Sequence, residues 1–195
     1  MIDDLDKTLE ALLRHELPPT LVNQVTISFA TPDDQFPPPS VTLPALDLFL
    51  YDLRENRELR SNEWLVERSN GTVTQKRPPV RLDCSYLITA WASDSSTTPA
   101  HDEHRLLGEV MKVLLRHSTI PAEVLQGSLQ GQDPPLPTGV LHPGRLQSLA
   151  EFWQALGGKP KTAFHYLVTI GVDVHPPLVV GPPVRDTLLR IGPGA

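Results

Sequence analysis

The chain has 195 residues, enough for one well-buried core, and a net charge of -6. Nucleic-acid affinity rests on clustered Lys and Arg that displace counterions, so this acidic balance argues against a DNA or RNA partner. A single cysteine excludes an internal disulfide, and we find no apolar run close to the roughly 20 residues that span a bilayer. We therefore expect a chain made in the cytoplasm that binds neither nucleic acid nor membrane.

The N-terminal part of the chain predicts one helix followed by strands. Leucines at helical spacing and acidic residues in the first turn predict a helix over residues 2–15. A short strand at residues 25–30 leads into a proline-rich loop, residues 31–44, and loops of that length tend to be functional or mobile. Residues 45–54 predict a strand at the centre of the sheet, with residues 48–51 buried on both faces.

A β-hairpin is predicted next. The pair Asn70-Gly71 favours a type I′ turn, because both central residues of that turn need positive φ. Residues 64–67 and 72–76 flank the pair and have strand character. The turn itself should be tight and exposed.

The second half of the chain predicts two strands and two helices. Residues 80–92 predict a long strand in which Cys84 is a small buried hydrophobe, not a nucleophile. Residues 99–117 predict the main core helix, and a capping box that begins at Ser148 opens a shorter helix. Residues 164–174 alternate cleanly as a strand. The apolar stripe of the core helix consists of Leu106, Leu107, Val110, Met111, Val113, Leu114 and Leu115.

The composition shifts near the C-terminal end, where prolines and glycines become frequent. We interpret residues 1–175 as one α+β domain with a mixed or antiparallel sheet and helices mainly on one side. Residues 176–195 are interpreted as a Pro/Gly-rich C-terminal arm with one short strand.

Catalytic and metal sites receive little support from the sequence. His101 and His104 flank two carboxylates at the start of the core helix, which leaves open a small-ligand or metal-dependent enzyme as an alternative. An exposed polar turn is the simpler interpretation. Strand aspartates could converge as paired carboxylates, although salt bridges to Arg54 or Arg81 are commoner at strand ends. These aspartates are Asp47, Asp52, Asp83 and Asp173. We expect no enzyme, cofactor or metal.

The most informative segment is the charged block, which we define as residues 54–64. Its charges nearly cancel, so it offers many directional donors and acceptors with little net field. Such a segment suits a protein partner, and a solvated loop whose charges pair with each other is the simpler alternative. The candidate interface residues are Arg54, Glu55, Asn56, Arg57, Glu58, Arg60, Asn62, Glu63 and Trp64.

Together with residues 81–91 and 151–158, the charged block resembles the N-terminal domain family of tube-terminating cap proteins of phage-tail-like contractile injection systems. The resemblance covers residues 1–174 and implies a tail-terminator fold. It also implies a ring of identical chains, expected to be six-fold, at the end of the inner tube distal to the baseplate. Such a ring stops tube polymerisation and engages the last sheath layer, in a particle that can be released from the cell.

The implied partners are other copies of the chain, the inner tube protein and the sheath protein. A ring of identical chains needs a heterologous interface, and the charged block is the candidate for that contact or for the contact with tube or sheath. Residues 31–44 and the arm after residue 174 are candidates to add strands to a neighbour's sheet. A monomeric assembly adaptor remains an alternative.

Overall fold

The structure is a computed structural model that describes residues 1–69, 72–141 and 148–181. Its helices are α1 (Ile2–Glu16), α2 (Pro19–Val22), α3 (Pro99–Arg116) and α4 (Leu149–Ala155), with 3-10 turns at Ala122–Val124 and Gly127–Leu129. Its strands are β1 (Thr26–Ser28), β2 (Ala45–Glu55), β3 (Leu65–Ser69), β4 (Thr72–Lys76), β5 (Val80–Trp91), β6 (Thr138–Val140), β7 (Ala163–Val172) and β8 (Leu178–Gly181).

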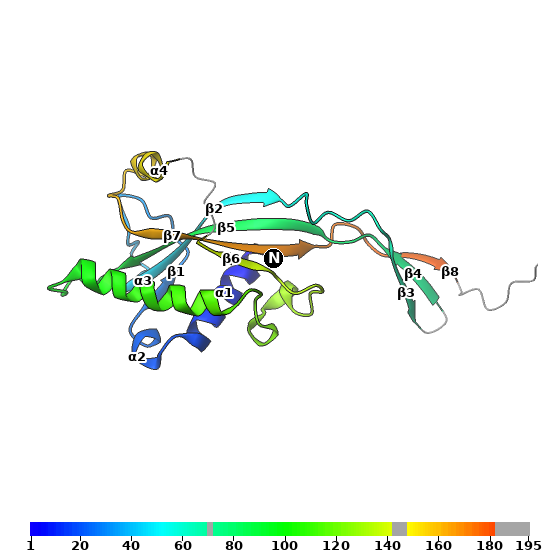
Figure 1. Ribbon diagram of the computed structural model, residues 1–195, viewed down its shortest axis with the longest axis horizontal. Helices are drawn as coiled ribbons and strands as arrows, with labels where there is room; N and C mark the ends of the chain where they lie inside the picture. The colour runs from blue at the N-terminus through cyan, green and yellow to red at the C-terminus, as the bar shows by residue number, and fades with distance from the viewer. Residues whose placement is uncertain (70–71, 142–147, 182–195) are drawn as a thin grey trace, which may run out of the picture.

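Two sheets give the molecule its elongated shape (Figure 1). The body contains the five-stranded sheet β1-β2-β5-β7-β6, and a small sheet of order β3-β4-β8, here called the distal sheet, lies at the far end. In the body sheet β1 and β2 are parallel and the other neighbours are antiparallel. The predicted α+β class with a mixed sheet is confirmed.

The order of the body sheet corrects one prediction. The strand at residues 45–54 is not the centre of the sheet, because β5 occupies the middle and pairs with both β2 and β7. Burial on both faces occurs at Ala45–Leu48, at the start of β2, whereas residues 49–52 are half-buried. Phe49 and Tyr51 lie on the same face of β2, and the ring of Phe152 from α4 packs near both but covers them only partly.

The main core lies between one face of the body sheet and helices α1 and α3 (Figure 1). Leu9 on α1, Leu114 on α3 and Cys84 on β5 are fully buried in one core cluster, which confirms the predicted core helices and the buried cysteine. Leu115 was predicted in the same apolar stripe, but it is 55% exposed. It follows Leu114 by one residue, and a helix turns by about 100° per residue, so the side chain leaves the core.

The opposite face of the body sheet is covered by α4 and by residues 31–44. Phe36 is buried in that loop and stacks on Trp91 with 4.2 Å between ring centroids. The loop is therefore held against the sheet at this point. The predicted capping box is confirmed, since the Ser148 hydroxyl accepts a hydrogen bond from the Glu151 amide at the start of α4.

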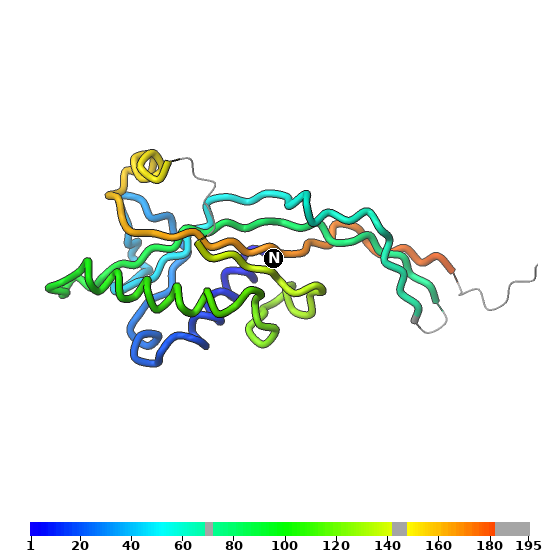
Figure 2. The backbone as a smooth tube through the Cα atoms, in the orientation of Figure 1, coloured from blue at the N-terminus to red at the C-terminus, as the bar shows by residue number. Residues whose placement is uncertain are grey.

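The predicted hairpin strands are confirmed as β3 and β4, which pair antiparallel with Ser69 opposite Thr72. The predicted Asn70-Gly71 turn lies outside the described residues. The distal sheet gains its third strand from β8, which pairs with β4. Figure 2 shows the three segments, residues 56–64, 77–79 and 173–177, that connect the body to this sheet.

Candidate interaction surface

The charged block connects the end of β2 to the start of β3, so it lies along the passage from the body to the distal sheet (Figure 1). Eight of its nine candidate interface residues are exposed, and the side chain of Arg57 is 85% exposed. The remaining candidate, Asn56, is half-buried. The block is therefore a surface segment with one inward-facing residue.

Asn56 fastens the start of the block to the central strand. Its backbone N–H donates to the Arg81 carbonyl over 2.8 Å, and its side-chain Nδ2 donates to Asp83 Oδ1 over 3.1 Å. Its side-chain oxygen accepts a hydrogen bond from the Leu59 amide over 3.1 Å. These contacts show that Asn56 holds the charged block in place. The neighbouring charged side chains point outward, where they can face a partner.

The three arginines of the block lie close to two carboxylates, those of Asp52 and Glu55. Arg60 lies 3.3 Å and Arg57 lies 4.0 Å from Glu55, and Arg54 lies 2.8 Å from Asp52. Exposed pairs of this kind contribute about 0–1 kcal/mol each to stability. Glu58 and Glu63 make no ion pair with any described residue.

An aromatic contact closes the block. The guanidinium of Arg77 lies 5.1 Å from the centroid of the Trp64 ring, and the indole remains 42% exposed. A cation over an aromatic face contributes about 0.5–1 kcal/mol at an exposed site. Trp64 thus packs on the segment between β4 and β5 and still offers a large surface to a partner.

The distal sheet is the feature that sequence reasoning missed. None of its described side chains is buried, and Figure 1 shows the helices gathered around the body and not over this sheet. Its exposed apolar side chains are Leu65, Val66, Leu178, Val179 and Val180, which are 48% to 71% exposed. The run Leu-Val-Val between two proline pairs was the available signal, because contiguous exposed apolar residues mark interaction sites.

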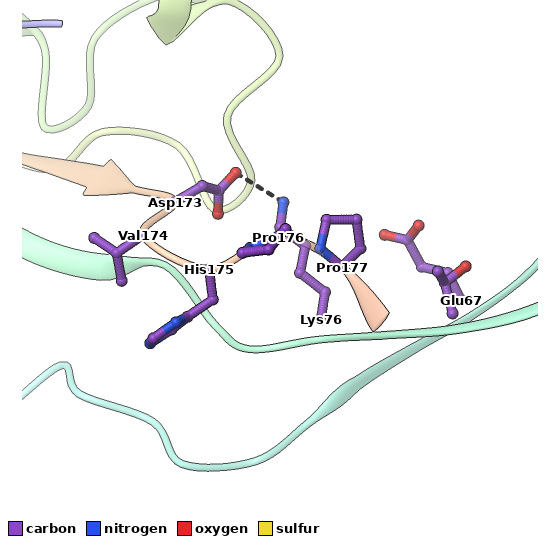
Figure 3. Close-up of a pocket in the computed structure, with 8 residues that line it drawn as sticks. Glu67, Lys76, Asp173, Val174, His175, Pro176 and Pro177 are labelled. Atoms are coloured by element: carbon purple, nitrogen blue, oxygen red, sulfur yellow. Dashed lines mark hydrogen bonds and ion pairs between the residues drawn. The ribbon is translucent and has the colours of Figure 1, made fainter. Parts of the chain in front are cut away.

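A groove of about 600 Å³ lies where the distal sheet meets the body (Figure 3). Glu67, Thr74 and Lys76 line it from the distal sheet, and residues 173–177 line it from the segment after β7. The Lys76 ammonium lies 2.8 Å from Asp173 Oδ2 and joins the two parts across the groove. The groove is thus bridged by an ion pair that ties the distal sheet to the body.

The residues considered for enzyme chemistry do not form a site. His101 is exposed, and His104 Nε2 lies 3.2 Å from the Thr162 hydroxyl. Across residues 1–69, 72–141 and 148–181 no group of three or more His, Cys, Asp or Glu side chains could hold a metal ion. The strand aspartates have separate surroundings. Asp52 pairs with Arg54, Asp83 accepts hydrogen bonds from Asn56 and Thr169, and Asp173 pairs with Lys76. Asp47 is fully buried, and neither of its carboxylate oxygens has a hydrogen-bond partner among the described residues.

No helix in the described part of the chain is long and apolar enough to cross a membrane.

Cys84 is fully buried, and burial raises the pKa of its thiol to about 12. A thiol with so high a pKa carries almost no thiolate near neutral pH, so it is a poor nucleophile.

Two solved structures of terminator proteins share the fold of this chain. The first is the "PVC sheath/tube terminator in extended state" of an extracellular contractile injection system, with a TM-score of 0.67 and 25% identity over 100% of this chain and 64% of that chain. The second is the anti-feeding prophage cap, described as the "AFP tube terminating cap", with a TM-score of 0.66 and 25% identity over 98% of this chain and 61% of that chain.

The sequence matches the family model of the Pvc16 N-terminal domain over residues 4–186, and this chain belongs to that family. The resemblance seen in the charged block is thereby confirmed. The chain spans somewhat less than two thirds of the length of each of the two solved structures. No curated protein matches its sequence.

Proposed function

We propose that this chain caps the inner tube of a contractile injection system, ending tube polymerisation and engaging the last sheath layer at the end distal to the baseplate. The family match over residues 4–186 is the observation that carries the proposal. It is supported by the fold, which is shared with a sheath/tube terminator and a tube-terminating cap over nearly the whole chain. The role is structural and not enzymatic.

The proposed partners are other copies of the chain in a six-fold ring, the inner tube protein and the sheath protein. Synthesis and assembly take place in the cytoplasm, within a particle that can be released. Residues 1–175 serve as the terminator domain and residues 176–195 as a C-terminal arm. No nucleic acid, membrane, metal or cofactor is needed for this role.

The charged block is the proposed contact between the cap and a neighbouring protein. Arg57 is almost fully exposed, and Glu58 and Glu63 make no ion pair within the described chain. Charges in this state can meet opposite charges on a partner without first breaking a strong internal contact. Trp64 adds a half-exposed indole of the kind that anchors protein interfaces.

A strain that produces the whole injection system without this chain tests the proposal. Electron microscopy should show tubes of irregular length with poorly attached sheaths, and supplying the full-length chain should restore a uniform length. Particles of normal, uniform length without the chain would refute a cap function. Light scattering and negative-stain microscopy, with and without tube protein, separate a ring from the alternative of a monomeric adaptor.

A further inference from the structure

Among the described residues, no further strand pairs with either edge of the distal sheet. Within the described residues β3 pairs only with β4, and β8 also pairs only with β4. A free edge presents backbone N–H and C=O groups that can pair with a strand of another chain. We propose that the distal sheets of neighbouring copies join edge to edge, with β8 of one copy pairing with β3 of the next. This inference specifies the self-contact in the proposed ring and rests on that proposed function.

The exposed apolar side chains gather on these two edge strands. On β3 Leu65 and Val66 are 48% and 49% exposed, and on β8 Val179 and Val180 are 71% and 57% exposed. The central strand β4 is mostly Thr, Gln and Lys. Soluble proteins usually protect a free edge with charge or proline, but the four residues of β8 contain neither. The β8 edge therefore has the character of a surface that a partner covers, and β3 offers exposed Leu65 and Val66 beside its charged Glu67 and Arg68.

The strand directions favour a second copy as that partner. Because β3 and β8 are each antiparallel to β4, they run parallel to each other. Copies related by rotation about one axis repeat this order, so β8 of one copy meets β3 of the next as a parallel pair. Each added copy leaves the same two edges open. Such a heterologous contact can continue until the ring closes.

Charge disfavours a two-fold pairing of two β3 strands. Two β3 strands in a fully overlapping antiparallel pair would set Glu67 against Glu67, and a shift of the register by two would set Arg68 against Arg68. Like charges directly opposite each other are destabilising. Pairing β3 with the uncharged β8 avoids this repulsion. When Leu178 lies beside Val66 of the next copy, His175 lies beside Glu63, which brings a basic group to an acid that makes no ion pair within the described chain.

The register within the distal sheet allows a sharp crosslinking test. Val66, Gln75 and Leu178 form one cross-strand row, so Val66 and Leu178 lie on the same face, whereas Val179 belongs to the row of Thr74 on the opposite face. Within one chain β3 and β8 are two strand spacings apart, about 10 Å, and a disulfide needs Cα atoms within about 7 Å. A disulfide between these strands must therefore join two chains.

The test oxidises the full chain carrying Val66→Cys with Leu178→Cys, and a second variant carrying Arg68→Cys with Leu178→Cys to cover the neighbouring register. Buried Cys84 does not compete. At least one variant should lose most of its monomer band on a non-reducing gel and form a ladder of multimers. The matched control, Val66→Cys with Val179→Cys, places its thiols on opposite faces and should stay monomeric, although Val179 is more exposed than Leu178.

Three results would overturn the inference. The first is that neither same-face variant forms a ladder, and the second is that the opposite-face control forms an equal ladder. The third is that the single variant Leu178→Cys forms dimers to the same extent as the double variant, which would indicate a two-fold β8 contact. The crosslinking result is independent of the tube-length assay. If a cap-less strain makes irregular tubes and no ladder forms, the proposed function stands and the edge contact fails. If ladders form but tube length never depends on the chain, the proposed function fails instead.

Discussion

Asn56 donates a hydrogen bond from Nδ2 to Asp83 Oδ1 over 3.1 Å, and this contact ties the charged block to the central strand of the body sheet. The Asp83 carboxylate also accepts a hydrogen bond from the Thr169 hydroxyl of β7 over 2.7 Å. The start of the block is thus held by the body, while its other candidate residues face outward. Fold and proposed interface can therefore be separated by substitutions a few residues apart.

Asn56→Ala should lower the free energy of unfolding by about 1 kcal/mol, because two side-chain hydrogen bonds are lost and the buried Asp83 loses a donor. Asn62→Ala is the matched control, since Asn62 is an exposed asparagine of the same block. Urea unfolding of the two variants and the wild type measures the difference. Equal stability of the two variants would show that Asn56 does not anchor the block.

Reversing charge at the exposed part of the block should impair capping without unfolding the chain. Arg57→Glu and Glu58→Lys each change a solvent-exposed charge, so stability should change little, while a charge on the proposed partner then faces a like charge. Electron microscopy of tube length in cells producing each variant is the measurement. Circular dichroism of the purified variants controls for folding. Uniform tubes of normal length from both folded variants would show that the charged block is not part of the interface.

Leu114→Ala should lower the free energy of unfolding by about 2–5 kcal/mol, because a fully buried side chain of α3 leaves a cavity. Leu107→Ala should lower the free energy of unfolding by a similar amount, since Leu107 is also buried. The neighbouring Leu115→Ala is the control, and at 55% exposure it should stay within about 0.5 kcal/mol of the wild type. Denaturant unfolding measures the free energy of unfolding of each variant. A loss of stability for Leu115→Ala as large as that for Leu114→Ala would contradict the assigned buried face of α3.

Asp47 should make stability depend on pH. It is fully buried on β2, neither of its carboxylate oxygens has a hydrogen-bond partner among the described residues, and burial raises the pKa of its carboxyl to about 7. The folded state then holds its proton more tightly than the unfolded state, whose pKa is about 3.9. The stabilising contribution is full below pH about 4 and is lost as the pH rises through about 7.

The test compares wild type and Asp47→Asn by urea unfolding at several pH values. The asparagine cannot ionise, so the variant should gain stability relative to the wild type as the pH rises from about 4 to about 8. Asp94→Asn replaces an exposed carboxyl on a loop and serves as the control. A constant difference between wild type and Asp47→Asn across this range would show that Asp47 keeps the same proton affinity on folding.

Local pattern was enough to predict most elements of the body. The leucine spacing of α1 and α3, the capping box at Ser148 and the alternation of β7 each reflect the period of one element, which a sequence carries directly. The charged block and its flanking motifs likewise indicated the family. The sequence also identified the nine residues of the block as surface chemistry suited to a partner, but it did not single out Asn56 as an anchor.

The sequence by itself determined most of the helices and strands, although not the short α2 and β6, and it indicated which family the chain belongs to. The tertiary structure alone decided that β8 pairs with β4, a strand about a hundred residues earlier, and that these strands stand apart from the body as an uncovered sheet. The physical reason is that periodicity specifies the buried face of an element but not its partner. Partner choice depends on contacts between distant segments, and for this reason the exposed edges of β3 and β8 could be recognised only once the whole chain was folded.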